Sequence, residues 1–156
     1  MNAILVRGVE EDDLVPIVEL LLQFKEFAHS ESKPNLVQVK GLYSEMLRNP
    51  QQYKNMVASV NGAVVGFISV VYYRSFFSMG GTALINELVV SGLHRRSGIG
   101  SALVQAAVQI ARRDAMDQIE VGTDRANESA TSLYRKLGFG IEYRLFGMSL
   151  ASNQAT

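Results

Sequence analysis

The sequence has no cysteine, no excess of charge of either sign and no long hydrophobic run. Without cysteine the chain has no disulfide framework, no thiolate nucleophile and no Cys-ligated zinc or iron–sulfur site. Fifteen Lys and Arg residues balance fifteen Asp and Glu residues, so no overall field draws the chain to nucleic acid or to an anionic membrane. The longest apolar runs have the length of a strand, far short of the ~20 residues of a membrane span. We therefore expect neither a nucleic-acid partner nor a membrane partner.

The chain does have enough apolar material for one folded domain. Hydrophobic residues make up 47% and charged residues 19% of its 156 residues, a composition that excludes wholesale disorder. A second core of comparable size would have no material left. We expect a single domain over residues 1–150 and a frayed tail at 151–156. The first residues lack the basic region and apolar segment of a signal peptide, so we expect a soluble, cytoplasmic protein.

Hydrophobic periodicity divides the chain into strand and helix patterns. The strand patterns cover residues 3–7, 56–60, 64–72, 82–91, 119–122 and 141–150, and the helix patterns cover 14–25, 37–47, 98–113 and 129–137. The Asn61-Gly62 turn predicts a hairpin between the second and third strands. Later strands alternate with helices. This order predicts an α+β fold with a central, twisted, mixed and mostly antiparallel sheet flanked by helices.

The segment from Leu88 to Gly100 carries the clearest chemical signal. A buried-strand pattern is followed by a short polar loop, two glycines two positions apart and a helix. Free N–H groups at a helix N-terminus, with glycines that allow close backbone approach, form an anion site. The third glycine of a dinucleotide-binding loop and the lysine of a nucleotide-triphosphatase loop are absent, which disfavours a nucleotide-binding module. From these residues alone, the alternative to an anion site is a tight strand-to-helix connection that binds no ligand.

Two motifs resemble those of the GNAT (GCN5-related N-acetyltransferase) superfamily. Arg95-x-x-Gly98-x-Gly100 is similar to its coenzyme A pyrophosphate loop, Arg/Gln-x-x-Gly-x-Gly/Ala. The run from Asn127 to Phe139 is similar to its Asn-x-x-Ala-x-x-x-Tyr-x-x-x-Gly-Phe helix. The resemblance covers nearly the whole chain and is weakest over residues 10–50. It departs at Ser91-Gly92, where many members have a proline, and this departure affects the stiffness of the loop.

The resemblance implies acetyl-CoA as the cosubstrate, with no metal. Backbone N–H groups of the loop would hold the pyrophosphate, helped by about half a positive charge at the helix N-terminus. The preceding strand would splay from its neighbour and offer backbone groups to the pantetheine arm, with the Val90 N–H at the oxyanion site. Asn127 would bind the same arm, and a helix cap is its alternative role. The implied cosubstrate-binding residues are Leu88, Val89, Val90, Arg95, Arg96, Ser97, Gly98, Ile99, Gly100, Ser101, Asn127 and Tyr134.

Tyr134 and Glu87 are the expected catalytic residues. Tyr134 lies at the superfamily's general-acid position, where a phenol of pKa about 10 would protonate the thiolate that leaves when an amine attacks a thioester. Glu87 is an acid in a buried-strand pattern, and burial would raise its pKa. It is expected to orient the amine or to relay its proton through water. A purely packed Tyr134 and a Glu87 paired with an arginine are the structural alternatives.

The leading interpretation is an acetyl-CoA-dependent N-acetyltransferase that acts on a primary amine of a small molecule, by direct attack in a ternary complex. The alternatives are a non-catalytic acyl-CoA-binding sensor and an acetyltransferase of a protein N-terminus or lysine. Local likeness to aminoalkylphosphonate N-acetyltransferases lies in Arg48-Asn49-Pro50, in Asn61-Gly62 and in the run from Asn86 to Val90. The aromatic run from Tyr72 to Phe77 indicates either a wall of the acceptor cleft or a dimer contact, and we expect a homodimer.

Overall fold

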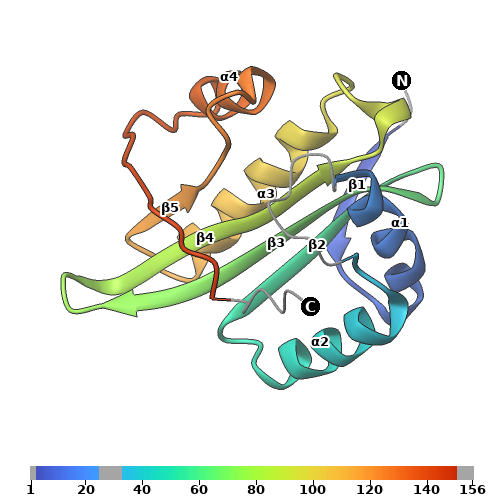
Figure 1. Cartoon of the computed structure of the whole chain (residues 1–156), viewed down its shortest axis with the longest axis horizontal. Coiled ribbons are helices and arrows are strands. Elements are labelled where there is room, and N and C mark those ends of the chain that lie inside the picture. The colour runs from blue at the N-terminus through green and yellow to red at the C-terminus, as the bar shows by residue number, and fades with distance from the viewer. Residues whose placement is uncertain (1–2, 25–32, 151–156) are drawn as a thin grey trace, which may run out of the picture.

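A five-stranded sheet forms the centre of the computed structural model, which describes residues 3–24 and 33–150 (Figure 1). The strands follow the chain in the order β1-β2-β3-β4-β5. The first four pair antiparallel, and the last is parallel to the fourth. Their bounds are β1 (Ile4–Gly8), β2 (Tyr53–Val60), β3 (Ala63–Ser75), β4 (Ser78–Val90) and β5 (Gln118–Val121). The predicted α+β fold with a mixed, mostly antiparallel sheet is confirmed.

Helices cover both faces of this sheet (Figure 1). Successive residues of a strand point to opposite faces, so Val57 packs with α1 side chains while Met56 and Ala58 pack with those of α3. No helix in the described ranges is long and apolar enough to cross a membrane. The helical elements are η1 (Glu11–Asp13), α1 (Leu14–Phe24), α2 (Leu36–Arg48), η3 (Gly92–His94), α3 (Ile99–Arg113) and α4 (Glu128–Lys136), where η marks a 3-10 turn.

A buried carboxylate fixes the start of α1. Asp13, only 4% exposed, accepts hydrogen bonds of 2.6 and 2.9 Å from the Arg7 guanidinium and one of 2.8 Å from the Glu10 N–H. The hydrogen bonds from Arg7 hold the pKa of this carboxyl below its ordinary value. The bidentate pair ties β1 to the turn before α1, and it places α1 over the face of the sheet that carries Val57.

One residue of β4 interrupts its pairing with β3. Ser69 pairs with Glu87 and the next pair is Val70 with Ile85, so Asn86 is an extra residue and forms a β-bulge. Pairing between β4 and β5 stops at the same place, because Ile85 is the last β4 residue with a partner in β5. Beyond Ile85, β4 therefore pairs only with β3 within the described residues.

The segment predicted as a last strand, residues 141–150, is irregular in the structure. It runs past β5 without pairing to any described strand (Figure 1). The apolar alternation of Ile141, Tyr143 and Leu145 changes phase at Phe146, so no single strand face collects the apolar side chains. All of these side chains are exposed. The strand prediction is wrong for this segment, and the predicted frayed tail at 151–156 lies outside the described residues.

Candidate functional site

The open side of β4 is the first part of the site. The Ser91 N–H donates to the Val65 carbonyl oxygen at 2.9 Å, on the β3 side. Backbone groups of an antiparallel strand alternate between its two sides, so Val89 also faces β3. The N–H groups of Leu88 and Val90 face the side from which β5 has separated. Of the three predicted strand residues, Leu88 and Val90 thus present free backbone donors, whereas Val89 uses its backbone groups in the β3–β4 ladder.

The N-terminus of α3 is the second part. Its helical hydrogen bonding begins where the Ala102 N–H donates to the Gly98 carbonyl oxygen at 2.9 Å. The N–H groups of Ile99, Gly100 and Ser101 precede this bond, so they have no acceptor inside the helix. Gly98 caps the helix with a φ of 87°, in the left-handed region that glycine adopts most readily. The structure therefore offers a row of free backbone donors here.

Gly100 brings this helix N-terminus close to α4 and to β4. A Cβ atom at this position would lie 3.3 Å from Leu133 Cδ2 and 3.9 Å from Val90 Cγ2. The missing side chain therefore lets this helix N-terminus pack closely against α4 and β4. Arg95 and Arg96 are exposed, and neither has an ion-pair partner among the described residues.

Tyr134 is fixed by packing, and its hydroxyl is unpaired. The side chain is 8% exposed, belongs to the same apolar cluster as Ile99 and Leu103, and its ring centroid lies 5.6 Å from that of Phe139. The hydroxyl has no hydrogen-bond partner in the described part of the chain. The hydroxyl oxygen is not fully buried either. Burial raises the pKa of the phenol to about 12.

Asn127, the other polar residue of the second motif, caps α4. Its Oδ1 accepts a hydrogen bond of 3.1 Å from the Ala130 N–H. This is the helix-cap geometry that the sequence left as the alternative. The side-chain oxygen is thus already used within the protein.

Glu87 lies on the α1 face of the sheet, two residues before Val89, which packs in the same cluster as α1. The buried Ser69 hydroxyl donates to its carboxylate, and Asn86 Nδ2 lies 3.4 Å from Oε1. Burial raises the pKa of this carboxyl, against a smaller lowering by the Asn86 amide. No arginine pairs with Glu87 among the residues described. The predicted structural alternative, a Glu–Arg pair, is therefore not what the structure shows.

Sequence reasoning missed Ser69 and Asn86, which surround the carboxylate. Ser69 is the one hydroxyl residue in the apolar run 63–71, a signal that was available. Asn86 stands out only through its place in the bulge, which depends on pairing with β3.

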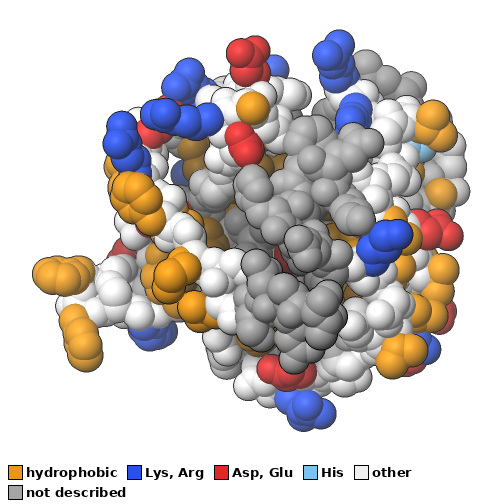
Figure 2. Space-filling model, in the orientation of Figure 1, with side chains coloured by type: hydrophobic (Ala, Val, Ile, Leu, Met, Phe, Trp, Pro, Cys, Tyr) orange, Lys and Arg blue, Asp and Glu red, His pale blue; other side chains and the backbone are white. Residues whose placement is uncertain are grey.

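The aromatic run from Tyr72 to Phe77 does not form a single surface. Tyr72 is 9% exposed and donates to Asp114 Oδ2 at 3.1 Å, whereas the Tyr73 hydroxyl donates to Glu120 Oε2 at 2.8 Å. Phe76 and Phe77 are fully exposed at the tip of the β3–β4 hairpin, which projects beyond the sheet. Apolar side chains gather at this tip in Figure 2. Tyr72 is therefore a core residue rather than part of a cleft wall.

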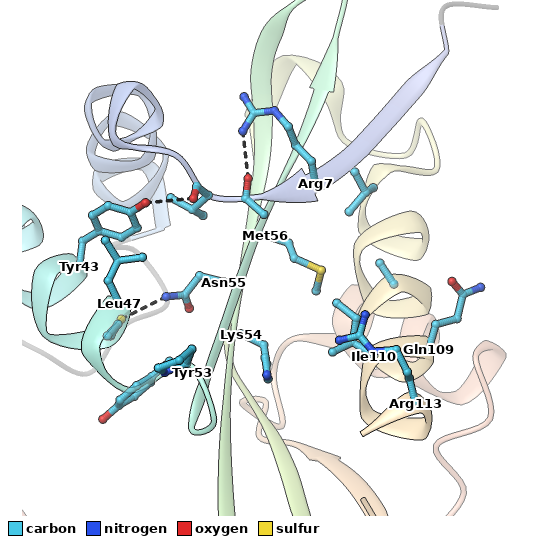
Figure 3. Close-up of a pocket in the computed structure, with 16 residues that line it drawn as sticks. Arg7, Tyr43, Leu47, Tyr53, Lys54, Asn55, Met56, Gln109, Ile110 and Arg113 are labelled. Atoms are coloured by element: carbon cyan, nitrogen blue, oxygen red, sulfur yellow. Dashed lines mark hydrogen bonds between the residues drawn. The ribbon is translucent and has the colours of Figure 1, made fainter. Parts of the chain in front are cut away.

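A separate groove lies at the β1–β2 edge of the sheet, between α2 and α3 (Figure 3). Its volume is about 480 Å³, and its lining includes Tyr43, Lys54, Asn55, Ile110 and Arg113. It contains none of the residues that the sequence predicted for the site. The groove is thus distinct from the open side of β4.

Comparisons with known proteins agree with the two motifs. Residues 14–139 match the sequence profile of the Acetyltransferase (GNAT) family. The chain is 31% identical over 104 residues to N-acetyltransferase family 8 member 3 of Rattus norvegicus, covering 63% of this chain and 46% of the rat protein. It is 29% identical over 139 residues to an uncharacterized N-acetyltransferase of Methanocaldococcus jannaschii, covering 86% and 59% of the two chains. The chain thus spans about half the length of these relatives.

A solved structure shows the same fold. The putative acetyltransferase of Agrobacterium tumefaciens superposes with a TM-score of 0.81 at 20% identity, covering 93% of this chain and 99% of that one. The family match includes both the loop before α3 and the helix with Tyr134. The chain therefore belongs to the acetyltransferase (GNAT) family, as the two motifs predicted.

Proposed function

We propose that the protein is an acetyl-CoA-dependent N-acetyltransferase whose acceptor is a primary amine of a small molecule. The observation that carries the proposal is the open side of β4 beside the unpaired N-terminus of α3. Members of the family use acetyl-CoA as cosubstrate. The donors on both elements are backbone groups, so this chain offers fixed hydrogen bonds to a ligand that lies between them.

The loop before α3 fits a pyrophosphate. The free N–H groups of Ile99, Gly100 and Ser101 point out of the helix end, where the dipole contributes about half a positive charge. The exposed guanidinium groups of Arg95 and Arg96 are free to approach the phosphates. These five residues, with Ser97 and Gly98, would hold the diphosphate.

The free N–H groups of Leu88 and Val90 would hold the pantetheine arm and the carbonyl that reacts. Acetyl-CoA supplies the acetyl group as a thioester. Negative charge develops on the thioester oxygen during attack, and a fixed N–H donor stabilises it without having to reorganise. The Val90 N–H serves this oxygen in the proposal. Tyr134 holds a proton for the leaving sulfur, because a phenol with a pKa of about 12 stays protonated at neutral pH.

Glu87 would receive the amine on the α1 face of the sheet. An amine reaches the site as an ammonium ion and must lose a proton before it attacks. One carboxylate, beside the Ser69 hydroxyl and the Asn86 amide, matches the single cationic group of a small amine. The match fits a primary amine of either acceptor class, and the acceptor assay below distinguishes a small molecule from a protein.

The Gly100→Glu variant tests the loop assignment. Wild-type protein at ~100 times the dissociation constant of acetyl-CoA is expected to gain about 2.7 kcal/mol of stability. Gly100→Glu should lose most of this gain, because its carboxylate would lie where the pyrophosphate is proposed to bind. Thermal unfolding with and without acetyl-CoA measures the difference.

Two matched variants separate charge from bulk. Gly100→Gln has the same side-chain length without the charge, so it should retain more binding than Gly100→Glu. Gly41→Glu adds the same charge on α2, where a Cβ atom meets nothing within 4 Å, and should bind as wild type does. Full acetyl-CoA binding by a folded Gly100→Glu protein would rule out the loop assignment. An assay of thiol release with small amines and with peptides then distinguishes a small-molecule acceptor from a protein acceptor, and binding without any release would indicate a sensor.

We also propose that the protein forms a homodimer through the tip of the β3–β4 hairpin. Phe76, Phe77 and Met79 are exposed there, and leaving such a patch in water is unfavourable. Light scattering should give about twice the 17.1 kDa mass of one chain. The double variant Phe76→Ser, Phe77→Ser should give the mass of one chain. A wild-type monomer would contradict the prediction.

A further inference from the structure

We infer that Gln23, in the last turn of α1, is a positioning residue that holds the loop before α3 in its binding conformation. The Gly92 N–H donates a hydrogen bond to Gln23 Oε1 at 3.1 Å. Gly92 is the first residue of η3, which joins β4 to the loop 95–98. The inference rests on the proposed function, because it takes acetyl-CoA as the ligand of this loop.

The loop has an unfavourable backbone conformation and few bonds to hold it. Arg96 has a φ of 61°, in the left-handed region that an arginine seldom adopts. Gly98, with a φ of 87°, adds a second left-handed residue. Within residues 91–97 the bonds run from the His94 N–H to the Ser91 carbonyl oxygen and from the Ser97 hydroxyl to the His94 carbonyl oxygen. A loop of this kind needs outside support to keep one conformation.

That support comes from two directions in the described structure. On the β3 side, the Ser91 N–H donates to the Val65 carbonyl oxygen at 2.9 Å. On the α1 side, Gln23 accepts from Gly92, and it is the one side chain outside the loop that hydrogen-bonds residues 91–97 within the described residues. Without this bond η3 would be free to move on that side, at a glycine, which is the residue with the most backbone freedom.

A looser loop should weaken cosubstrate binding without changing the chemical step. When the binding conformation is populated for only part of the time, the apparent dissociation constant rises by the inverse of that fraction. Once the cosubstrate is bound, the loop is in place. Gln23 should therefore affect the KM for acetyl-CoA and leave kcat unchanged, which separates positioning from catalysis.

The backbone at Gly92 offers an independent way to fix the same turn. Ser91 has a ψ of 135°, the region that a residue before proline adopts, and Gly92 begins a 3-10 turn without a positive φ. A Cβ atom at position 92 would meet only Gln23 Oε1, at 3.9 Å. Gly92→Pro is therefore compatible with the fold. It removes the N–H that Gln23 accepts from, the exposed Gln23 side chain turns away, and the ring restricts the turn instead.

The experiment is a double-mutant cycle on coenzyme A binding, measured by calorimetry. Gln23→Ala in the wild-type background should raise the dissociation constant about three- to tenfold, the worth of one hydrogen bond. In the Gly92→Pro background the same change should have no effect, because the N–H is already gone. The kcat at saturating acetyl-CoA should be the same in all four proteins. Glu19→Ala, an exposed change one turn earlier in α1, is the matched control and should bind as wild type does.

The other outcomes contradict either the role of Gln23 or the proposed function. If wild-type protein binds coenzyme A and Gln23→Ala binds equally well, the positioning role is wrong and the proposed function stands. If Gln23→Ala causes the same loss in both backgrounds, Gln23 acts through something other than the Gly92 N–H, and the inference fails. If the wild-type protein does not bind coenzyme A, the proposed function fails and this inference fails with it.

Discussion

Replacing Tyr134 by phenylalanine is expected to lower kcat by about 10²-fold while the affinity for coenzyme A stays nearly unchanged. The phenylalanine ring keeps the packing against Phe139 and the apolar cluster around α3. The hydroxyl has no partner among the described residues, so its removal leaves no other group unsatisfied. The expected loss therefore comes from the single proton that Tyr134 would give to the leaving sulfur.

The raised pKa of Tyr134 bears on how this proton moves. With a pKa of about 12, the phenol is fully protonated at neutral pH. An ordinary cysteine thiol has a pKa of about 8.5, so transfer to a solvated thiolate would be unfavourable. A sulfur that left against the buried ring would be poorly solvated, and burial would raise the pKa of its thiol as it does that of the phenol. This effect would reduce the difference between the two pKa values and so favour the transfer.

Steady-state kinetics with acetyl-CoA as the varied substrate measures this effect. A fall in kcat without a change in KM identifies an interaction made only in the transition state. Tyr143→Phe is the matched control, because Tyr143 is exposed on the irregular segment after α4. Full kcat in Tyr134→Phe would assign the proton to water. A loss of several kcal/mol in the free energy of unfolding would instead mark the hydroxyl as structural.

Local sequence patterns predicted the parts of the site that lie within one stretch of chain. The loop from Arg95 to Gly100 and the helix with Tyr134 were recognisable because each motif combines a turn glycine with a helix end in a few residues. The left-handed φ of 98° at Gly138, just after α4, belongs to the same class of local signal.

Features that depend on strand register could not be predicted in this way. The family resemblance implied that β4 separates from its neighbour, but the bulge at Asn86 and the end of the β4–β5 pairing at Ile85 are set by the register of the neighbouring strands, which no local pattern contains. The contact of Ser69 with Glu87 joins residues 18 positions apart for the same reason. The bulge and the end of the β4–β5 pairing determine which backbone groups of β4 are free at the candidate site.

The incorrect strand prediction at 141–150 shows that an alternating local pattern is not enough to form a strand. Apolar residues alternate through Leu145, which is typical of a strand, yet no described strand pairs with the segment. A strand also requires a neighbouring strand edge that matches it in register and in burial, and the alternating pattern contains no information about that edge. The aromatic run at 72–77 is divided for a different reason, because it extends from the paired end of β3, where Tyr72 is buried, into the turn where Phe76 is exposed.

Glu87→Gln is expected to lower kcat/KM at neutral pH by roughly 10²-fold and to flatten the acid side of the pH profile. A general base works in its deprotonated form, so the wild-type rate should fall as the pH falls through the pKa of Glu87. Burial raises this pKa above its ordinary value of 4.5, which places the acid limb closer to neutral pH. Glutamine does not titrate, and the variant should therefore show a low rate that is independent of pH in this range.

Two further variants test whether the limb belongs to this carboxyl. The Asn86 amide lowers the pKa of Glu87, so Asn86→Ala should move the acid limb to higher pH without abolishing the activity. Glu120→Gln changes a carboxylate on β5 that binds Tyr73, and it should leave the limb in place. If the limb is unchanged in Glu87→Gln, the amine loses its proton to water or arrives already neutral. In that case Glu87 serves only as the structural acceptor of the Ser69 hydroxyl at the bulge in β4.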